Sequence, residues 1–188
     1  MKLLVTFSEG EPSPHVLVRR LLLYGLGESA LPEIKTGPHG KPYFAGYPVK
    51  FNLSHCKGAV CCALGEHEVG VDIERVRPYH EKLAERICTP SERKLAENAC
   101  DPAKALIALW SLKESFLKYT GEGMRYGFQN AEFSFDAQGR PFCAAQNVNC
   151  ALFEPAPGFV LAACAAGALP EHFSVIDPAY LPSLPHTY

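Results

Sequence analysis

The sequence predicts an α+β fold built from two similar lobes. Three observations predict it. Residues 1–7, "MKLLVTF", open as a strand, and residues 13–27 and 101–121 have the apolar spacing of helices. Each helical segment is followed by paired apolar segments with tight turns. We therefore expect an N-terminal lobe over residues 1–70 and a C-terminal lobe over 71–188, together one compact unit.

The first half of the chain contains one strand pair and one irregular loop. The "SPHVLVRRLLLYGLG" stretch has a proline near its start and a glycine stop, as helices often do. The Gly- and Pro-rich residues 36–48 predict an irregular loop. Residues 50–76 predict two strands around a turn at Gly65–Glu66, and "AVCCAL" within them is apolar throughout. Such a strand is expected to be buried on both faces.

The second half predicts two helices and further strands. Ser91 is a candidate cap for a helix over "SERKLAEN". The long helix is better marked, because Asp101 can cap it, Pro102 suits its first position and Gly121 can end it. Residues 131–142 and 150–167 predict strands, and the proline-punctuated tail over 177–188 is expected to wrap the surface or fray.

Composition narrows the class of protein. The 188 residues are 47% hydrophobic and 20% charged, as in an ordinary globular protein. The net charge of −2 gives no overall basic field, so we expect no nucleic-acid partner. No signal sequence and no apolar stretch long enough for a bilayer is evident, so we expect a cytoplasmic protein with no membrane partner. Its eight cysteines, with no CxxC pair, are then expected to be reduced thiols.

Two acids interrupt an apolar strand in "EVGVDIERVRP". Asp72 and Glu74 lie two residues apart, so their side chains point to the same face of the strand. Two carboxylates this close repel unless a cation lies between them or one is protonated. Mg²⁺ favours such hard oxygen ligands. The alternative is an exposed edge strand whose acids are balanced by Arg75 and Arg77.

Three other groups are candidates for phosphate chemistry. Glu114 and Lys118 lie four residues apart and share a face of the long helix, although they can equally form a surface ion pair. Ser54 and His55 precede the apolar strand, where an imidazole can donate to phosphate. Ser54 has no GxSxG elbow, so a nucleophilic triad is not favoured. Lys41, in "GKP", places an ammonium on a Gly/Pro loop that is too short for a P-loop.

Four stretches in this order, "GKPYF", "FNLSHC", "VGVDIE" and "WSLKESFLKYTGEG", resemble the 4′-phosphopantetheinyl transferases of the surfactin-synthetase-activating type. The resemblance runs from about Gly40 to Gly123 and continues weakly in "PGFVLAACA". It implies a pseudo-two-fold pair of similar α/β lobes, with antiparallel sheets and one long helix per lobe, that encloses coenzyme A. It also implies transfer of the phosphopantetheine arm to a serine of an acyl, peptidyl or aryl carrier protein, with release of adenosine 3′,5′-bisphosphate.

The resemblance also implies roles for individual residues. The residues that match the Mg²⁺-binding positions are Asp72, Glu74 and Glu114, and those that match the coenzyme A-binding segments are Lys41, Pro42, Ser54, His55 and Lys118. Lys118 matches the lysine at the pyrophosphate and His55 the histidine at a coenzyme A phosphate. We expect Lys118, His55 and the metal to stabilise the charge that develops on the phosphoryl oxygens. Glu114 is the candidate base, acting directly or through a metal-bound water.

The chain departs from the family pattern near its N-terminus. Longer members carry a basic segment there for the 3′-phosphate of coenzyme A, whereas this chain is acidic and proline-rich; Arg19 and Arg20 point in different directions on a helix. Two alternatives stay open: a degenerate protein that binds coenzyme A or a carrier without transfer, and an unrelated Mg²⁺-dependent phosphodiesterase. We expect a monomer. Basic residues downstream of the DxE strand are candidates for contact with an acidic carrier, unless they only balance neighbouring glutamates: Arg75, Arg77, Lys82, Arg86, Arg93 and Lys94.

Overall fold

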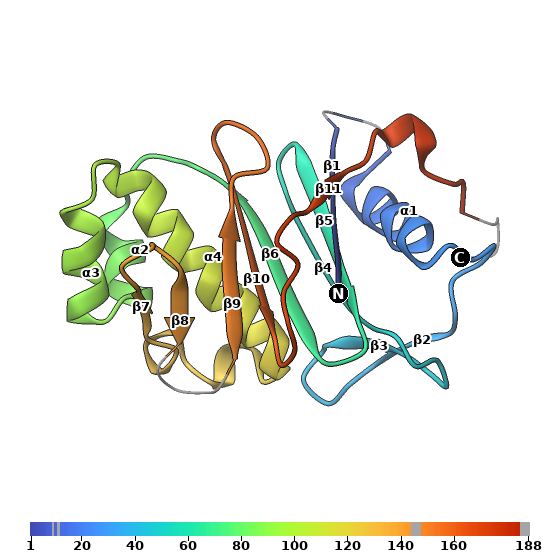
Figure 1. Cartoon of the computed structure of the whole chain (residues 1–188), viewed down its shortest axis with the longest axis horizontal. Helices are drawn as coiled ribbons and strands as arrows, with labels where there is room; N and C mark the ends of the chain where they lie inside the picture. Colours follow the sequence, from blue (N-terminus) through green and yellow to red (C-terminus); the bar gives the residue numbers. More distant parts are fainter. Residues whose placement is uncertain (9, 11, 144–147, 185–188) are drawn as a thin grey trace.

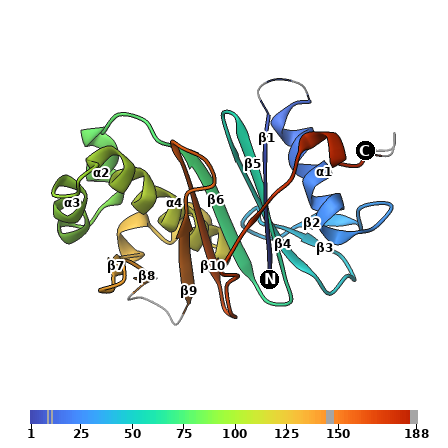
Figure 2. The ribbon, with the colours of Figure 1, turned by 45° about the horizontal axis from the view of Figure 1, so that its top comes forward.

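The computed structural model describes residues 1–8, 10, 12–143 and 148–184. Two lobes lie side by side along the longest axis of the molecule (Figure 1). Each lobe packs a long helix against a largely antiparallel sheet, and the sheets meet in the middle of the molecule (Figure 2). The expected α+β class, with one long helix per lobe, is therefore confirmed.

The N-terminal lobe is built on a four-stranded sheet in the order β11-β1-β5-β4. Only the β1–β11 pair is parallel. The helix α1 (Pro14–Leu26) packs on this sheet and ends at Gly27, whose φ of 73° is a left-handed conformation that favours glycine. The four strands are β1 (Lys2–Phe7), β4 (Lys50–Cys56), β5 (Ala59–Gly65) and β11 (Ser174–Val175).

The loop expected over residues 36–48 is partly regular. A short antiparallel hairpin forms from β2 (Ile34–Thr36) and β3 (Pro42–Phe44). The glycines and prolines lie mainly in its connection and in the segment that follows it. Because proline is tolerated at the first residue of a strand, Pro42 does not prevent β3 from pairing.

The C-terminal lobe is built on a five-stranded antiparallel sheet in the order β6-β10-β9-β8-β7. The helix α4 (Pro102–Thr120) packs against β6 and β10, while α2 (Glu81–Ile87) and α3 (Pro90–Glu97) lie at the far end of the lobe. The strands are β6 (Val69–Arg75), β7 (Phe133–Phe135), β8 (Pro141–Cys143), β9 (Asn149–Phe153) and β10 (Phe159–Ala165). Three 3₁₀ turns are η1 (Gly123–Arg125), η2 (Phe128–Asn130) and η3 (Pro178–Tyr180).

The expected ends of α4 are confirmed, but the expected cap of α3 is wrong. Asp101 accepts a hydrogen bond from the Lys104 N–H, and Gly121 ends α4 with a φ of 74°. The cap of α3 is Thr89 rather than Ser91. Thr89 lies three residues before Glu92, so the two form a reciprocal capping box with Pro90 in the first helical position.

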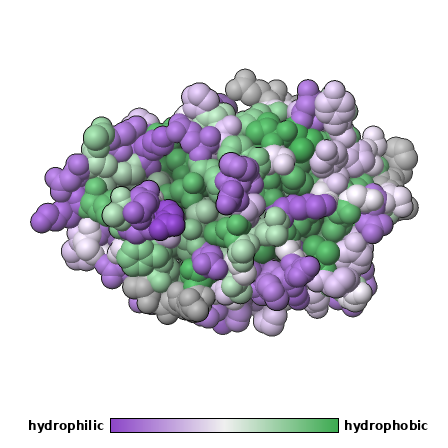
Figure 3. All heavy atoms as spheres, in the orientation of Figure 1, coloured by the Kyte–Doolittle hydropathy of each residue, from purple (hydrophilic) through white to green (hydrophobic). Residues whose placement is uncertain are grey.

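Apolar side chains form three cores. One lies under α1 in the N-terminal lobe, one lies under α4 in the C-terminal lobe, and the third lies between the two sheets. The β5 strand contributes to two of them, because Cys62 faces the first core and the adjacent Cys61 faces the third. The prediction that "AVCCAL" is buried on both faces is confirmed. Figure 3 shows apolar residues extending across the middle of one face, over the meeting of the lobes.

The C-terminal segment returns to the first lobe. β11 pairs with β1, and Leu181 packs in the core under α1. The Arg20 guanidinium donates to the carbonyl oxygens of Leu181 and Pro182, at 2.5 and 2.7 Å. The described part of the tail therefore wraps the surface, and residues 185–188 lie outside the described residues. The lobe boundary at residue 70 stays a prediction.

Candidate functional site

The site lies where the edge strands of the two sheets, β4 and β6, face each other. Side chains of β4 connect them. The Asn52 Oδ1 accepts a hydrogen bond from the Val71 N–H at 2.9 Å, and the Ser54 hydroxyl donates to Asp72 Oδ1 at 2.8 Å. Edge strands leave backbone groups unpaired, and here polar side chains take the place of a ladder. This arrangement fixes Asp72 at the junction of the lobes.

Gly70 brings α4 close enough to reach that junction. A Cβ atom at position 70 would lie 1.9 Å from the Ser115 carbonyl oxygen and 2.5 Å from the Tyr119 nitrogen, so any larger residue would force the helix away. The close approach places Lys118 against Asp72. The glycine in "VGVDIE" is thus required by packing, a role that its place in the strand did not reveal.

Lys118 and Asp72 form the centre of the site. The Lys118 ammonium donates to Asp72 Oδ1 at 2.7 Å, to Ser54 Oγ at 2.9 Å and to the Val71 carbonyl at 3.2 Å. Burial lowers the pKa of Lys118, but the Asp72 carboxylate and its hydrogen bond outweigh that effect, so the pKa lies above its usual value. Lys118 is therefore a fixed positive charge at neutral pH.

The second oxygen of the Asp72 carboxylate, Oδ2, differs from the first. Oδ2 is buried and accepts no hydrogen bond from any residue that the structure describes. A buried carboxylate oxygen without a partner is costly, and such atoms often mark the place of a ligand. A hard divalent cation would satisfy this oxygen.

Glu74, on the same face of β6, has both oxygens engaged. Oε1 accepts from the Trp110 indole N–H and Oε2 from the Arg77 guanidinium, each at 2.9 Å. Trp110 lies on α4 one turn before Glu114, so the helix that carries the third acid also orients the second. Trp110 lies within the apolar spacing of residues 101–121, and that pattern does not indicate the hydrogen bond from its indole to Glu74.

Glu114 completes the group of acids. Its side chain is half-buried and makes no hydrogen bond or ion pair with another described residue. Burial raises the pKa of Glu114, and the carboxylates of Asp72 and Glu74 raise it further against the opposing effect of Lys118. A carboxyl group with a raised pKa that faces other acids is suited to accept a proton.

The three acids suit Mg²⁺ in chemistry, although they do not form a closed cage. Over the described ranges, no group of three His, Cys, Asp or Glu side chains is arranged to hold a metal ion. A cation that completes its coordination shell with other oxygens nevertheless fits this group. The three acids offer oxygen ligands, Asp72 Oδ2 has no partner among the described residues, and the other carboxylates repel Glu114. Mg²⁺ commonly takes only one or two carboxylates together with waters and substrate phosphates.

His55 lies beside this centre and contacts a second imidazole. The rings of His55 and His15 are 4.9 Å apart and perpendicular, at 83°. Burial lowers the pKa of His55, as do the charges of His15 and Lys118, while Asp72 opposes them. His15 comes from the first turn of α1, so both lobes contribute to the surroundings of His55. No pattern in the sequence indicates that His15 lies here.

A cavity of about 290 Å³ adjoins the acids. Four predicted residues, Lys41, Pro42, Glu114 and Lys118, line it, together with His39 and Met124, among others. The Lys41 ammonium contacts Glu68 at 2.7 Å and the carbonyl oxygens of Val69 and Tyr119 at 3.1 and 3.0 Å. Lys41 therefore holds the β2–β3 connection against the end of α4, and its nucleotide-binding role stays a prediction.

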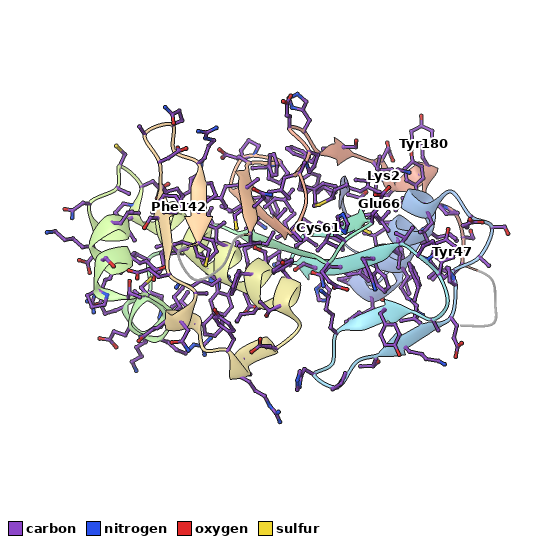
Figure 4. The ribbon with its side chains drawn as sticks, turned by 60° about the horizontal axis from the view of Figure 1, so that its bottom comes forward. Lys2, Tyr47, Cys61, Glu66, Phe142 and Tyr180 are labelled. Atoms are coloured by element: carbon purple, nitrogen blue, oxygen red, sulfur yellow. The ribbon has the colours of Figure 1, made fainter. Side chains whose placement is uncertain are left out.

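A larger cavity, about 560 Å³, lies elsewhere, and none of the predicted site residues lines it. It is bounded by the start of β1 and the β5–β6 turn. Figure 4 shows Lys2, Glu66 and Tyr47, which line this cavity, in the N-terminal lobe, with Phe142 on the opposite lobe. A cavity larger than the one beside the acids thus contains none of the predicted residues, so volume alone does not identify the site.

Curated relatives match most of the chain. It is 29% identical to Sfp from Bacillus subtilis over 86% of this chain and 76% of that protein, and 30% identical to psf-1 from Bacillus pumilus over 86% and 73%. AcpT from Escherichia coli is 33% identical over 74% and 73%. All three are named 4′-phosphopantetheinyl transferases. The chain spans about half the length of another relative, gsp from Aneurinibacillus migulanus, 47% of which it covers at 34% identity.

A solved structure gives a partial likeness only. The holo-[acyl-carrier-protein] synthase from Neisseria meningitidis shares 25% identity over 54% of this chain and 98% of its own, with a TM-score of 0.48, and no conclusion rests on it. The model of the 4′-phosphopantetheinyl transferase superfamily matches residues 68–164, just over half of the chain, including β6, α4 and β10. The resemblance and the enzyme class expected from the sequence are confirmed: the chain belongs to the 4′-phosphopantetheinyl transferase superfamily.

Proposed function

We propose that this enzyme transfers the 4′-phosphopantetheine arm of coenzyme A to a serine of an acyl, peptidyl or aryl carrier protein, with Mg²⁺. The observation that carries the proposal is the cluster at the junction of the lobes. Hydrogen bonds join Lys118, Asp72 and Ser54. Glu114 lies close enough for the charges of Asp72 and Lys118 to shift its pKa. Family membership supplies the reaction class, and this cluster supplies the groups that the reaction needs.

The reaction needs a proton acceptor and positive charge. The carrier serine oxygen forms a bond to the β-phosphorus of coenzyme A, and the bond from that phosphorus to the bridging oxygen breaks. Adenosine 3′,5′-bisphosphate leaves with that oxygen. Glu114 accepts the serine proton, directly or through a water, because its carboxylate makes no hydrogen bond or ion pair with another described residue and so is free to take part. Lys118 stabilises the negative charge that develops on the diphosphate oxygens.

Asp72 and Glu74 would hold Mg²⁺ together with Glu114. When bound, the ion would neutralise charge on the phosphoryl oxygens. Asp72 offers its free Oδ2, while Ser54 and Lys118 hold Oδ1 and so fix the direction of the carboxylate. Trp110 orients Glu74 in the same way. His55 would contact a coenzyme A phosphate, and Lys41 and Pro42 would line the nucleotide part of the pocket.

A groove beside Glu74 suits an acidic carrier protein. Arg77, Lys82 and Arg86 line it, with Tyr79 between them and a volume of about 590 Å³. Arg86 also lies over the Trp110 ring, 5.5 Å from its centre. Arg93 contributes little to this surface, because Glu81, Glu85 and Glu97 already pair with it. We therefore place the carrier over α2 rather than α3.

The state and location of the protein stay predictions. No helix in the described part of the chain has both the length and the apolar character needed to cross a bilayer. A monomer in the cytoplasm is the state proposed from the sequence. Sedimentation of the purified protein at several concentrations would test the monomer.

The test of function is transfer to a panel of apo carriers. The protein is incubated with coenzyme A, Mg²⁺ and each carrier, and mass spectrometry measures the carrier. We expect at least one carrier to gain the mass of the arm, and expect no gain with EDTA or with a carrier whose serine is replaced by alanine. Coenzyme A binding without any gain would favour the binding-only alternative. Hydrolysis of coenzyme A without transfer would favour the phosphodiesterase.

A further inference from the structure

The strands β9 and β10 place two thiols directly opposite each other. Cys150 and Cys164 are register partners in this antiparallel pair, and their Sγ atoms lie 3.3 Å apart. The two strands lie side by side in the C-terminal lobe (Figures 1 and 2). Neither thiol belongs to the proposed transfer chemistry, and the structure contains no disulfide among its eight cysteines.

The backbone geometry allows a bond between these two sulfurs. Opposite residues of an antiparallel pair have Cα atoms about 4.5–5.5 Å apart, which lies within the range of about 4.4–6.8 Å found for disulfides. A rotation of the side chains is then sufficient to form the bond, without displacement of a strand. Cys61 and Cys62 differ in this respect, because they are adjacent on β5 and face separate cores.

The two thiols differ in access to solvent. Cys150 is half-buried, whereas Cys164 is fully buried, with Ser115 Oγ 3.2 Å from its sulfur. Burial raises the pKa of the Cys164 thiol well above its usual value. A reagent in solution therefore reaches Cys150 first, and Cys164 is placed to react with whatever forms there. A partly accessible thiol with a second thiol in contact is a suitable arrangement for a reversible redox pair.

We propose that Cys150 and Cys164 are a redox modification site that low-molecular-weight disulfides convert to an intramolecular disulfide. In the first step, the Cys150 thiolate attacks a disulfide RSSR, forms a mixed disulfide and releases RS⁻. In the second, the Cys164 thiol gives its proton to the RS⁻ already released, its sulfur attacks Cys150 Sγ to form the protein disulfide, and the bond from Cys150 to the SR group breaks to release a second RS⁻, which takes a proton from solvent. The protein dithiol is oxidised by two electrons, and RSSR is reduced to two thiols.

The test is treatment of the folded protein with oxidised glutathione. We expect a product about 2 Da lighter than the starting protein and without attached glutathione, because two hydrogens are lost. Thiols titrated after denaturation should fall from eight to six, and dithiothreitol should restore them. The exposed Cys100 offers the matched control, and its replacement by serine should leave the lighter product unchanged.

Peptide mapping identifies the pair. No lysine or arginine follows Arg140, so trypsin leaves all three C-terminal cysteines in one peptide, and an additional chymotrypsin cut after Phe153 separates Cys164 from the others. The Cys143→Ala variant should still form the linked peptides, whereas Cys150→Ala should not. Because Cys150 is half-buried, its replacement should preserve the fold, which circular dichroism would check.

Three results would overturn the proposal. The first is glutathione retained on Cys150 with no lighter product. The second is modification confined to the exposed Cys100. The third is a disulfide that includes Cys143, which lies on the next strand, β8, and is also buried.

Discussion

Two lysines of the same helix, Lys113 and Lys118, form buried ion pairs that differ in how completely their polar atoms are hydrogen-bonded. Lys113 contacts Glu92 at 2.8 Å, and the two side chains are 0% and 1% exposed. Its ammonium also donates to the carbonyl oxygens of Phe128 and Ala131, at 2.8 and 2.6 Å. Both Glu92 oxygens accept backbone hydrogen bonds as well. This pair is fully satisfied and closed to solvent.

The Lys118 pair is open on one side. Asp72 Oδ2 has no partner in the described structure, and the Lys118 side chain is 28% exposed. The first pair ties α4 to α3 and to the turn before β7, which holds the lobe together. The second leaves an acceptor and a charge available at the junction of the lobes. Incomplete satisfaction, together with the partial exposure of Lys118, distinguishes the proposed functional pair from the structural one.

Lys113→Met should give the largest loss of stability. The substitution leaves the Glu92 carboxylate buried without its cation, which typically costs about 3–5 kcal/mol. Urea denaturation monitored by circular dichroism measures the change. Lys118→Met is the matched control and should lose less stability, because the Lys118 side chain is 28% exposed and solvent already screens part of this pair. Equal losses of stability in Lys113→Met and Lys118→Met would contradict the distinction between the closed and the open ion pair.

The transfer rate should show the reverse order, with the larger loss at the junction of the lobes rather than at Lys113. Lys118→Met and Glu114→Gln should each lower the transfer rate about 10²- to 10³-fold, equivalent to about 3–4 kcal/mol of transition-state stabilisation. The rate is measured from holo-carrier formation at saturating coenzyme A, with circular dichroism to confirm that each variant is folded. Wild-type turnover in Glu114→Gln would exclude Glu114 as the base.

Gly70→Ala tests whether the approach of α4 to β6 is required. The added Cβ would meet the Ser115 carbonyl at 1.9 Å, so the helix must shift, at a cost of about 1–3 kcal/mol. We expect a reduced transfer rate in protein that remains folded. Gly167→Ala is the control, because its Cβ would lie 3.3 Å from the His67 ring and far less displacement is needed. An unchanged rate in Gly70→Ala would show that the close approach is not needed.

The smallest expected effect is the pH dependence of Glu114. A carboxyl group with a raised folded-state pKa stabilises the fold below its unfolded pKa, and this contribution is lost as the pH rises through the folded pKa. Without metal, Glu114→Gln should therefore be more stable than the wild type at pH 7, and this advantage should shrink toward acidic pH. Thermal unfolding in EDTA at several pH values measures it. A Glu114→Gln variant that is less stable than the wild type at pH 7 would contradict the mutual repulsion of the three acids.

The sequence predicted the main site residues but not their supports. Asp72, Glu114 and Lys118 could be placed together because helix and strand periodicity and the family motifs agree. The hydrogen bonds from β4 that hold this part of β6 could not be predicted. Asn52 and Ser54 reach β6 from another sheet, and strand periodicity gives no distance between sheets. Lys113 and Lys118 also look alike in "WSLKESFLK". Only the fold shows that one faces Glu92 and the other Asp72.

The fold was predicted to a similar degree. Apolar periodicity identified α1, α4 and β5, and the capping residues of α4 were found because Asp, Pro and Gly have distinct backbone preferences. The α3 cap was missed because Thr89 precedes a proline outside the apolar pattern. The return of β11 to β1 depends on pairing between residues about 170 positions apart, as between Leu4 and Ser174, for which local patterns carry no signal.

The most direct measurement is a crystal structure with coenzyme A and Mg²⁺. The account predicts a magnesium ion on Asp72 Oδ2, with the diphosphate of coenzyme A against Lys118 and Glu114 within reach of the β-phosphorus. A diphosphate bound instead in the cavity beside Lys2 and His67, or an Asp72 that keeps an unoccupied Oδ2 in the complex, would contradict it.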